Sequence, residues 1–268
     1  MPLRLVVAGA TGWVGRALVA AITAAPDLDL VGAVARSRAG EDAGLASGLA
    51  PTGVTLTATL EEALAVASDV VIDYTKPHVV KGHALTALAS GRHVVIGTSG
   101  LTADDYEEID TAAKAAGRGV IAAGNFSITA TLLRKFALEA ARLVADVEII
   151  DYASPAKPDV PSGTGRELAE ALSAIRRPGT SKPVDELTGL KETRGATVAR
   201  PTPIQIHSVR MPSFVLSCEA IFGAPEERLV IRHDAGSSAA PYVGGTLLAA
   251  RKVVERVGLT RGMESLIG

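Results

Sequence analysis

The strongest constraint on the fold is the order of an apolar segment, a glycine-rich turn and a helical pattern at the start of the chain. The apolar segment is Leu3–Ala8, glycines follow at positions 9, 12 and 15, and a helical pattern runs over residues 16–25. Glycines without Cβ atoms and the free N–H groups of a helix N-terminus can together bind a pyrophosphate. A close-packed turn that binds nothing is the alternative, but a second strand-like segment over residues 28–34 favours a dinucleotide fold.

The alternation of strand and helix continues to residue 122. Apolar runs predict strands over residues 70–73, 93–96 and 119–122, and the segments between them predict helices over 59–67, 78–89 and 104–116. This order predicts an α/β fold with a Rossmann-like, doubly wound parallel sheet. Because ligands of such sheets bind beyond the carboxyl ends of the strands, residues 73–75, 97–99 and 124–126 should share one edge with the glycine turn.

The residues after the second strand bear on the choice of cofactor. NAD-selective sites usually place Asp or Glu here, whereas this chain has Arg36 and Arg38 in the segment 35–38, without an opposing carboxylate. Two guanidinium groups can bind a 2′-phosphate, so we expect NADPH to be preferred over NADH. The alternative is that both arginines point into solvent.

The character of the chain changes after residue 125. A helix is predicted over 129–143, a strand over 147–152, and a loop over 153–163 that leads into a helix over 165–175. Beyond a polar segment near residues 177–200, the sequence predicts strands over 204–210, 215–222 and 227–233 and an apolar helix over 242–257. We expect a dinucleotide-binding domain over 1–125, to which the C-terminal helical region 240–268 returns, and a second α+β domain with a mixed sheet over 126–239.

The loop before the second helix of this domain has the composition of an anion site. Thr164 and Glu167 have the spacing of a capping box, which predicts a helix start near Thr164, with Ser162 and Gly163 just before it. The N–H groups and hydroxyls there, with Lys157 upstream on the same loop, would bind a carboxylate. Ordinary capping beside a surface lysine is the alternative.

Composition favours small-molecule partners. Lys and Arg number 27 against 29 Asp and Glu, with no run of like charge that would indicate a nucleic-acid or membrane partner. Cys218 is the only cysteine and is expected in the core, so neither a disulfide nor a multi-cysteine metal site is expected. The sequence lacks the pattern of a signal peptide and has no uninterrupted apolar stretch of about 20 residues, so we expect a cytoplasmic protein.

Motifs along the whole chain carry a resemblance to a known family. They are residues 9–15, Asp73-Tyr74-Thr75-Lys76-Pro77, Gly97-Thr98-Ser99-Gly100, Asn125-Phe126-Ser127, Lys157-Pro158-Asp159-Val160-Pro161-Ser162-Gly163-Thr164 and Glu227–His233. In these motifs the chain is similar to dihydrodipicolinate reductase, also called 4-hydroxy-tetrahydrodipicolinate reductase, of the diaminopimelate and lysine pathway.

The resemblance implies a nucleotide-binding lobe, a hinge near Asn125, and a mixed-sheet lobe used for substrate binding and for oligomer contacts, often a tetramer. It assigns Lys157 to catalysis and Ser162, Gly163 and Thr164 to a substrate held between the lobes. Together with the reasoning from the residues, it gives sixteen candidate cofactor contacts: Gly9, Ala10, Thr11, Gly12, Trp13, Val14, Arg36, Arg38, Thr75, Gly97, Thr98, Ser99, Ala123, Gly124, Asn125 and Phe126.

The chain departs from the family upstream of Lys157. Family members usually read Glu-x-His-His-x-x-Lys, in which the histidines are the proposed proton donor and a substrate contact, whereas this chain reads Asp151-Tyr152-Ala153-Ser154-Pro155-Ala156-Lys157. Loss of a general acid typically costs about 10²–10⁴-fold in rate. An iminium that is already protonated on nitrogen needs no further proton for hydride addition, and Lys157, Tyr152 or Ser154 could polarise an imine. The five histidines are expected in structural positions, with His83 on a helix surface.

We therefore expect an NADPH-dependent reductase of a cyclic imine, or a related C=N bond, in a small amino-acid-like carboxylate. Three alternatives remain open: 4-hydroxy-tetrahydrodipicolinate reduction in lysine biosynthesis, oxidative deamination of a diamino acid as in relatives similar to diaminopentanoate dehydrogenase, and a non-catalytic NADPH-binding protein.

Overall fold

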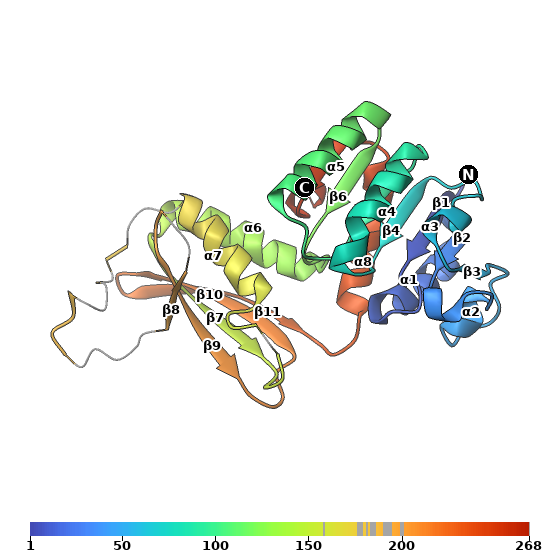
Figure 1. Ribbon diagram of the computed structural model, residues 1–268. Helices are drawn as coiled ribbons and strands as arrows, with labels where there is room; N and C mark the ends of the chain where they lie inside the picture. Colours follow the sequence, from blue (N-terminus) through green and yellow to red (C-terminus); the bar gives the residue numbers. More distant parts are fainter. Residues whose placement is uncertain are drawn as a thin grey trace. The chain divides into compact units, whose positions relative to one another are not determined.

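The computed structural model describes residues 1–157, 159–175, 179–180, 182, 186–189, 195–198 and 201–267. They form two compact units, one of Met1–Ile128 with Ser238–Gly268 and one of Thr129–Ser237 (Figure 1). Most of the polar segment near 177–200 lies outside the described residues. Each helix of the described part is too short or too polar to cross a lipid bilayer.

The first unit is built on a seven-stranded sheet in the order β12-β6-β5-β4-β1-β2-β3. Every adjacent pair in it is parallel, as the sequence predicts for a doubly wound sheet. The strands are β1 (Leu3–Ala8), β2 (Leu28–Val34), β3 (Leu56–Thr57), β4 (Val70–Asp73), β5 (His93–Ile96), β6 (Gly119–Ala122) and β12 (Gly258–Arg261). The central strands are short apolar runs because helices cover both faces of the sheet.

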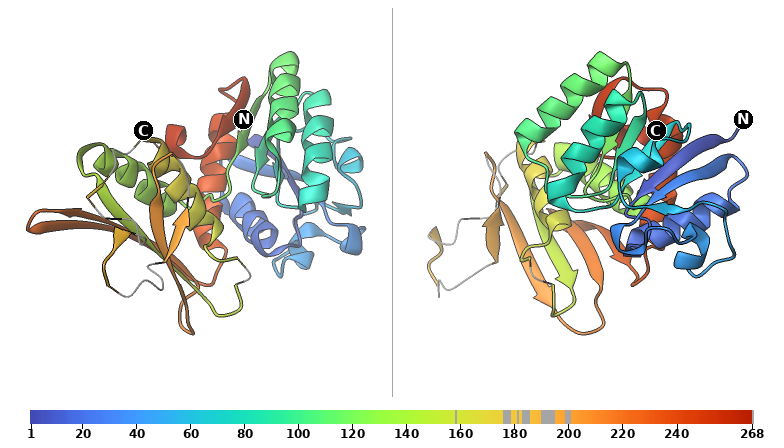
Figure 2. Two further views of the ribbon diagram at one scale, coloured as in Figure 1. Left: turned by 60° about the vertical axis from the view of Figure 1, so that its left-hand side comes forward. Right: turned by 45° about the vertical axis from the view of Figure 1, so that its right-hand side comes forward.

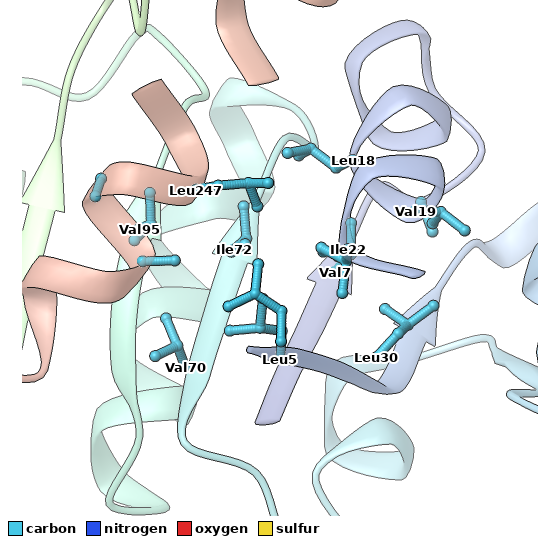
Figure 3. Packing of buried hydrophobic residues seen from close by; sticks show 14 of the residues in the cluster. Leu5, Val7, Leu18, Val19, Ile22, Leu30, Val70, Ile72, Val95 and Leu247 are labelled. Atoms are coloured by element: carbon cyan, nitrogen blue, oxygen red, sulfur yellow. The ribbon is translucent and has the colours of Figure 1, made fainter. Parts of the chain in front are cut away.

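Two groups of helices enclose this sheet. Apolar residues of α1 (Trp13–Ala24) and α8 (Ala240–Val253) pack on one face, where Leu18, Ile22 and Leu247 meet the side chains of β1 and β4 (Figure 3). The other face packs against α3 (Leu60–Ala63), α4 (Pro77–Ala89) and α5 (Ala103–Ala116). The short η1 (Arg36–Arg38), α2 (Ala43–Ala46) and η3 (Glu264–Leu266) complete the unit.

The end of the chain differs from the predicted helix over 242–257. Helix α8 ends at Val253, and Gly258, with a φ of +83°, turns the chain into β12, which pairs with β6. The apolar residues Val254 and Val257 continue the helical pattern in the sequence, although they lie in the connection to that strand. An edge strand of four residues is too short to show the alternation of apolar and polar residues by which a strand is predicted.

The second unit is a mixed five-stranded sheet in the order β11-β10-β7-β9-β8, with helices on one face (Figure 2). Its strands are β7 (Asp146–Ala153), β8 (Ala196–Val198), β9 (Ile204–Arg210), β10 (Leu216–Ala224) and β11 (Glu227–Ala235). Among the strand pairs that the structure describes in this sheet, only β7–β9 is parallel. Helices α6 (Ile128–Leu143) and α7 (Gly163–Ile175) contribute apolar residues to a core shared with the sheet, which confirms the predicted α+β lobe.

Candidate functional site

The carboxyl ends of four parallel strands lie level with one another in the first unit. Ala8 of β1 is paired with Asp73 of β4, Asp73 with Ile96 of β5, and Ile96 with Ala122 of β6. The segments that follow these strands, beginning at residues 9, 74, 97 and 123, therefore emerge side by side. This register brings the candidate cofactor residues of three loops and the glycine turn to one edge of the sheet, the edge at which such folds bind ligands.

Two glycines of this edge pack against Tyr74. Gly9 has a φ of +85°, and a Cβ atom on it would overlap the Tyr74 carbonyl oxygen. A Cβ atom on Gly97 would overlap the Tyr74 ring. The Tyr74 hydroxyl lies 2.7 Å from Oγ1 of Thr246 in α8, and burial raises the pKa of that hydroxyl above its usual value. The loops thus approach each other closely enough that only glycine fits at both positions.

Helix α1 begins without a side-chain cap. Gly12 is its N-cap residue, no side chain bonds to its first N–H groups, and its first turn holds no acidic residue. An uncapped helix start presents donors and a partial positive charge, and both favour an anion. The residues present therefore fit a cofactor pyrophosphate. Trp13 is 59% exposed and makes an edge contact with Tyr242, so its ring covers the helix start without entering the core.

A buried carboxylate connects the two loops that follow β4 and β5. Asp73 accepts hydrogen bonds at Oδ1 from the Thr75 backbone N–H at 2.9 Å, the Thr75 hydroxyl at 2.7 Å and the Thr98 hydroxyl at 3.0 Å. Its Oδ2 atom lies 2.8 Å from Nδ1 of His83 on α4. His83 is therefore turned inward with its side chain 18% exposed, and the expected surface position is wrong. No motif in the sequence joins Asp73 to a histidine ten residues later.

Replacing Asp73 by Asn should weaken cofactor binding about tenfold, because Thr75 and Thr98 would lose charge-assisted hydrogen bonds that fix their loops. Titration of NADPH fluorescence measures this change. Asp69→Asn is the matched control, since Asp69 precedes the same strand at its opposite end and binds Arg4. Equal NADPH affinities for the two variants would refute a positioning role for Asp73.

The two arginines after β2 differ in their surroundings. Arg38 donates to Glu41 through Nε at 3.0 Å and to the Ala46 carbonyl through Nη1 at 2.7 Å, and its contact with Glu41 raises its pKa. Glu41 is thus an opposing carboxylate, which the segment 35–38 does not contain. Arg36 is exposed and makes no ion pair in the described part of the chain. Arg36 is accordingly the more available of the two for a 2′-phosphate.

The candidate residues after β6 divide into exposed and buried groups. Gly124 is exposed, and the Asn125 side chain accepts a hydrogen bond from the Ser127 N–H at 2.8 Å. Phe126 is 1% exposed and packs beside Tyr74, with ring centroids 6.2 Å apart. Its side chain belongs to the core, so Phe126 could contact a cofactor only through its backbone. Ala10 is buried to the same extent in the glycine turn, whereas Ser99 is exposed.

The loop between β7 and α7 brings the other candidate residues together in the second unit. The Lys157 ammonium lies 2.8 Å from Oδ1 of Asp159, and the Gly163 backbone N–H donates to Oδ2 of the same carboxylate at 3.0 Å. One carboxylate therefore contacts both the lysine and the first residue of α7. We call Lys157, Gly163 and Thr164 the clamp. The Thr164 side chain is half-buried in the first turn of the helix.

The N-cap residue of α7 is Ser162, two residues earlier than the Thr164 that the sequence suggests. The helix begins at Gly163, and the Ser162 hydroxyl accepts from the Gly165 N–H at 3.2 Å. The expected capping box of Thr164 and Glu167 is therefore wrong, since Thr164 lies inside the first turn. Ser162 is 1% exposed and its hydroxyl supports the helix start, so any role of this side chain in ligand binding would be indirect.

A buried ion pair holds this loop in place. Asp151 is fully buried, and its Oδ2 atom accepts from the Ser162 N–H at 2.8 Å and from Nη2 of Arg210 at 2.8 Å. Arg210 also donates to the Asp159 carbonyl at 2.9 Å. The pair thus contacts the backbone at both Asp159 and Ser162, and it fixes the loop that carries the clamp. Arg210 has no role that the sequence predicts, because it lies 59 residues from its partner.

The positions of the missing histidines hold small residues. Ala153 is fully buried at the end of β7 and Ser154 is half-buried. Tyr152 alternates with Asp151 along the strand, so it lies on the opposite sheet face, where it packs against Phe214 and beneath Arg232. Tyr152 therefore faces away from Asp151, which binds the loop of the clamp. Of the three groups that could polarise an imine, Lys157 and Ser154 lie on that loop.

Known proteins match this chain along its whole length. The family described as Dihydrodipicolinate reductase, N-terminus, matches residues 3–126, and that described as Dihydrodipicolinate reductase, C-terminus, matches residues 129–267. A 4-hydroxy-tetrahydrodipicolinate reductase of Synechococcus elongatus is 39% identical over 99% of both chains. One from Desulfitobacterium hafniense is 38% identical over 99% of this chain and 98% of its own.

A solved structure agrees with these matches. The dipicolinate-bound dihydrodipicolinate reductase from Paenisporosarcina superposes with a TM-score of 0.86 at 29% identity, covering 100% of both chains. An amine dehydrogenase from Mycobacterium smegmatis shares the fold, with a TM-score of 0.67 at 15% identity over 97% of this chain and 95% of that one. The resemblance carried by the sequence motifs is confirmed: the chain belongs to the dihydrodipicolinate reductase family.

Proposed function

We propose that this protein is an NADPH-dependent reductase of a C=N bond in a small cyclic amino-acid-like carboxylate. The observation that carries the proposal is the clamp, in which Lys157 and the start of α7 already share one carboxylate, that of Asp159. An ammonium and a helix N-terminus directed at one point favour an anion there. A carboxylate of the substrate is the ligand with the matching charge and shape.

The edge of the first sheet supports the cofactor part of the proposal. The uncapped start of α1 suits the pyrophosphate, and the loops held by Asp73 suit the nicotinamide ribose. When bound, the reduced cofactor supplies a hydride for the C=N carbon. The protein's own residues contribute positioning: Thr75 and Thr98 are fixed by one carboxylate, and Lys157 with Gly163 orients the acid group next to the C=N bond.

The absence of histidines at residues 153 and 154 fits a substrate whose nitrogen arrives protonated. Addition of hydride to the carbon of such an iminium converts the π electrons to a nitrogen lone pair and gives a neutral amine. The step needs no proton from the protein. Lys157 acts here by binding and electrostatic orientation, which an ammonium performs at neutral pH.

Arg36→Gln should reduce the preference for NADPH over NADH about tenfold, because a charge-assisted bond to the 2′-phosphate contributes about 1.5–3 kcal/mol. Steady-state kinetics with each cofactor give the ratio of the two kcat/KM values. Arg16→Gln serves as a control, since Arg16 bonds to the Thr11 carbonyl of the glycine turn and a change there affects both cofactors alike, so their ratio should stay the same. A ratio unchanged by Arg36→Gln would mean that the 2′-phosphate lies elsewhere.

Reduction of 4-hydroxy-tetrahydrodipicolinate is the second candidate, favoured by relatives of that name at 38–39% identity over nearly the full chain. A panel of substrates distinguishes this reaction from the reduction of another cyclic imino acid. The protein is incubated with NADPH and with five- and six-membered cyclic imino acids, the same rings without the carboxylate, and 4-hydroxy-tetrahydrodipicolinate. We expect a carboxylate-bearing imine to be reduced at least about 10²-fold more efficiently than its bare ring. Equal efficiency for the imine with the carboxylate and the ring without it would contradict the assignment of the clamp as the carboxylate site.

The proposal assigns the first unit to the cofactor and the second to substrate binding and self-association. The edge strand β11 is nine residues long and exposes Leu229 and Val230, which suits pairing with a second copy. Cys218 is a buried free thiol, and burial raises its pKa to about 12. As the only cysteine it forms no internal disulfide, which suits a reducing compartment. We therefore propose a cytoplasmic homo-oligomer; sedimentation of the purified protein tests the oligomeric state.

A further inference from the structure

The carboxylate of Asp159 lies where the proposed function places the carboxylate of a substrate. It accepts from Lys157 Nζ at 2.8 Å and from the Gly163 N–H at 3.0 Å, which are two of the donors of the clamp. A backbone N–H has a single proton to donate, so Gly163 cannot fully serve Asp159 and a ligand at the same time. A ligand that uses this donor must replace Asp159.

Like charge reinforces this exclusion. The hydrogen bond from Lys157 holds the pKa of the Asp159 carboxyl below its usual value, so the group is ionised at neutral pH. A ligand carboxylate beside Asp159 would be repelled by its negative charge, because the single positive charge of Lys157 can balance only one of the two carboxylates. The competition between the two carboxylates therefore persists throughout the neutral range.

The contact is also placed so that it can open. The side chain of Asp159 is 45% exposed and that of Lys157 is 27% exposed, in contrast to the fully buried Asp151 that holds the same loop. Exposed ion pairs are weak, and a displaced Asp159 can be hydrated at once. The Asp159 carbonyl stays bound to Arg210, so the side chain can rotate away while the loop keeps its position.

We propose that Asp159 is an internal competitor of the substrate, a carboxylate that occupies Lys157 and Gly163 in the free protein and is displaced by the carboxylate of the ligand. The inference rests on the proposed function, since the clamp is its substrate site. Asp159 holds the two donors together before the ligand arrives, lowers the net affinity for the ligand, and returns to them when the product leaves.

Calorimetric titration of the full-length protein with dipicolinate tests the proposal. Asp159→Asn removes the competing charge and should bind dipicolinate about five- to tenfold more tightly, whereas Asp159→Glu, which keeps the charge, should stay within about twofold of the wild type. The dimethyl ester of dipicolinate carries no anionic oxygen, and its affinity should change less than about twofold in either variant. Circular dichroism confirms that each variant is folded.

Asp110→Asn is the matched control, because Asp110 also bridges a lysine ammonium and a backbone N–H, those of Lys114 and Leu259, in the other unit. Its dipicolinate affinity should equal that of the wild type. Equal or weaker binding of dipicolinate by Asp159→Asn, in a protein that reduces carboxylate-bearing imines, would overturn the inference alone. Failure of every variant to bind dipicolinate would overturn it together with the clamp of the proposed function.

Discussion

Replacing Lys157 with Gln should lower kcat/KM for a carboxylate-bearing imine by about 10²–10³-fold while leaving the Kd for NADPH within about twofold of the wild-type value. The ammonium is the only full positive charge among the clamp residues, and a charge-assisted bond to a carboxylate contributes about 1.5–3 kcal/mol before any effect on the reacting bond. Glutamine retains a donor and a similar length but loses the charge. Steady-state kinetics with saturating NADPH provide the measurement.

The control for this substitution is Lys114→Gln. Lys114 also pairs with an aspartate, Asp110, but on α5 of the other unit, and its side chain is 65% exposed. Its loss should leave kcat/KM unchanged within about twofold. A Lys157→Gln enzyme with near wild-type kcat/KM would show that the substrate carboxylate binds elsewhere, and the clamp would then be an ordinary capped helix beside a surface lysine.

Replacing Arg210 with Gln should destabilise the second unit by about 3–5 kcal/mol, because the fully buried Asp151 would be left without its counter-charge. The Arg210 side chain is only 15% exposed, so solvent cannot take over its role. Arg210 also donates to the Asp159 carbonyl, and its loss should loosen the loop of the clamp. We expect a higher KM for the substrate as well as a lower free energy of unfolding.

Amide hydrogen exchange measures this destabilisation within the second unit itself, whereas Trp13, the only tryptophan, belongs to the first unit. Arg251→Gln is the matched control. Arg251 makes a two-pronged pair with Asp27, but both side chains are about half exposed, and its removal should cost less than about 1 kcal/mol. Protection in Thr129–Ser237 that is unaffected by Arg210→Gln would contradict the importance assigned to the buried pair.

The parallel sheet could be predicted because its strands are short apolar runs bounded by glycine or polar residues. The residues predicted for β1, β2, β4, β5, β6 and β9 agree with the observed bounds. By contrast β3 has two residues and β12 has four, too few for a period to be seen. The apolar stretch after Val253 continues the pattern of α8, so the sequence could not show where that helix ends.

The candidate site could be predicted only where its contacts are local in the chain. The clamp and Asp159, the carboxylate that contacts it, lie within residues 157–164, and the composition of this short segment alone indicates an anion site. The helix start was misplaced because Ser162 and Thr164 both have capping side chains, and the choice depends on Asp151, which binds the Ser162 N–H from another strand.

Two contacts of the site that the sequence does not predict join residues on different elements of the fold. The Asp73–His83 contact joins a strand end to the middle of a helix, and Arg210 reaches Asp151 across neighbouring strands β7 and β9. Neither pairing has a sequence signature. Arg38 pairs with Glu41, only three residues away, but this carboxylate lies beyond the segment 35–38 from which the choice of cofactor is predicted.

A crystal structure of the protein with NADPH and dipicolinate tests the central claim most directly. The account predicts a dipicolinate carboxylate within hydrogen-bond distance of Lys157 Nζ and of the Gly163 N–H, with the Asp159 side chain turned away from both. A structure in which Lys157 points to solvent, and dipicolinate contacts neither this lysine nor the start of α7, would contradict it.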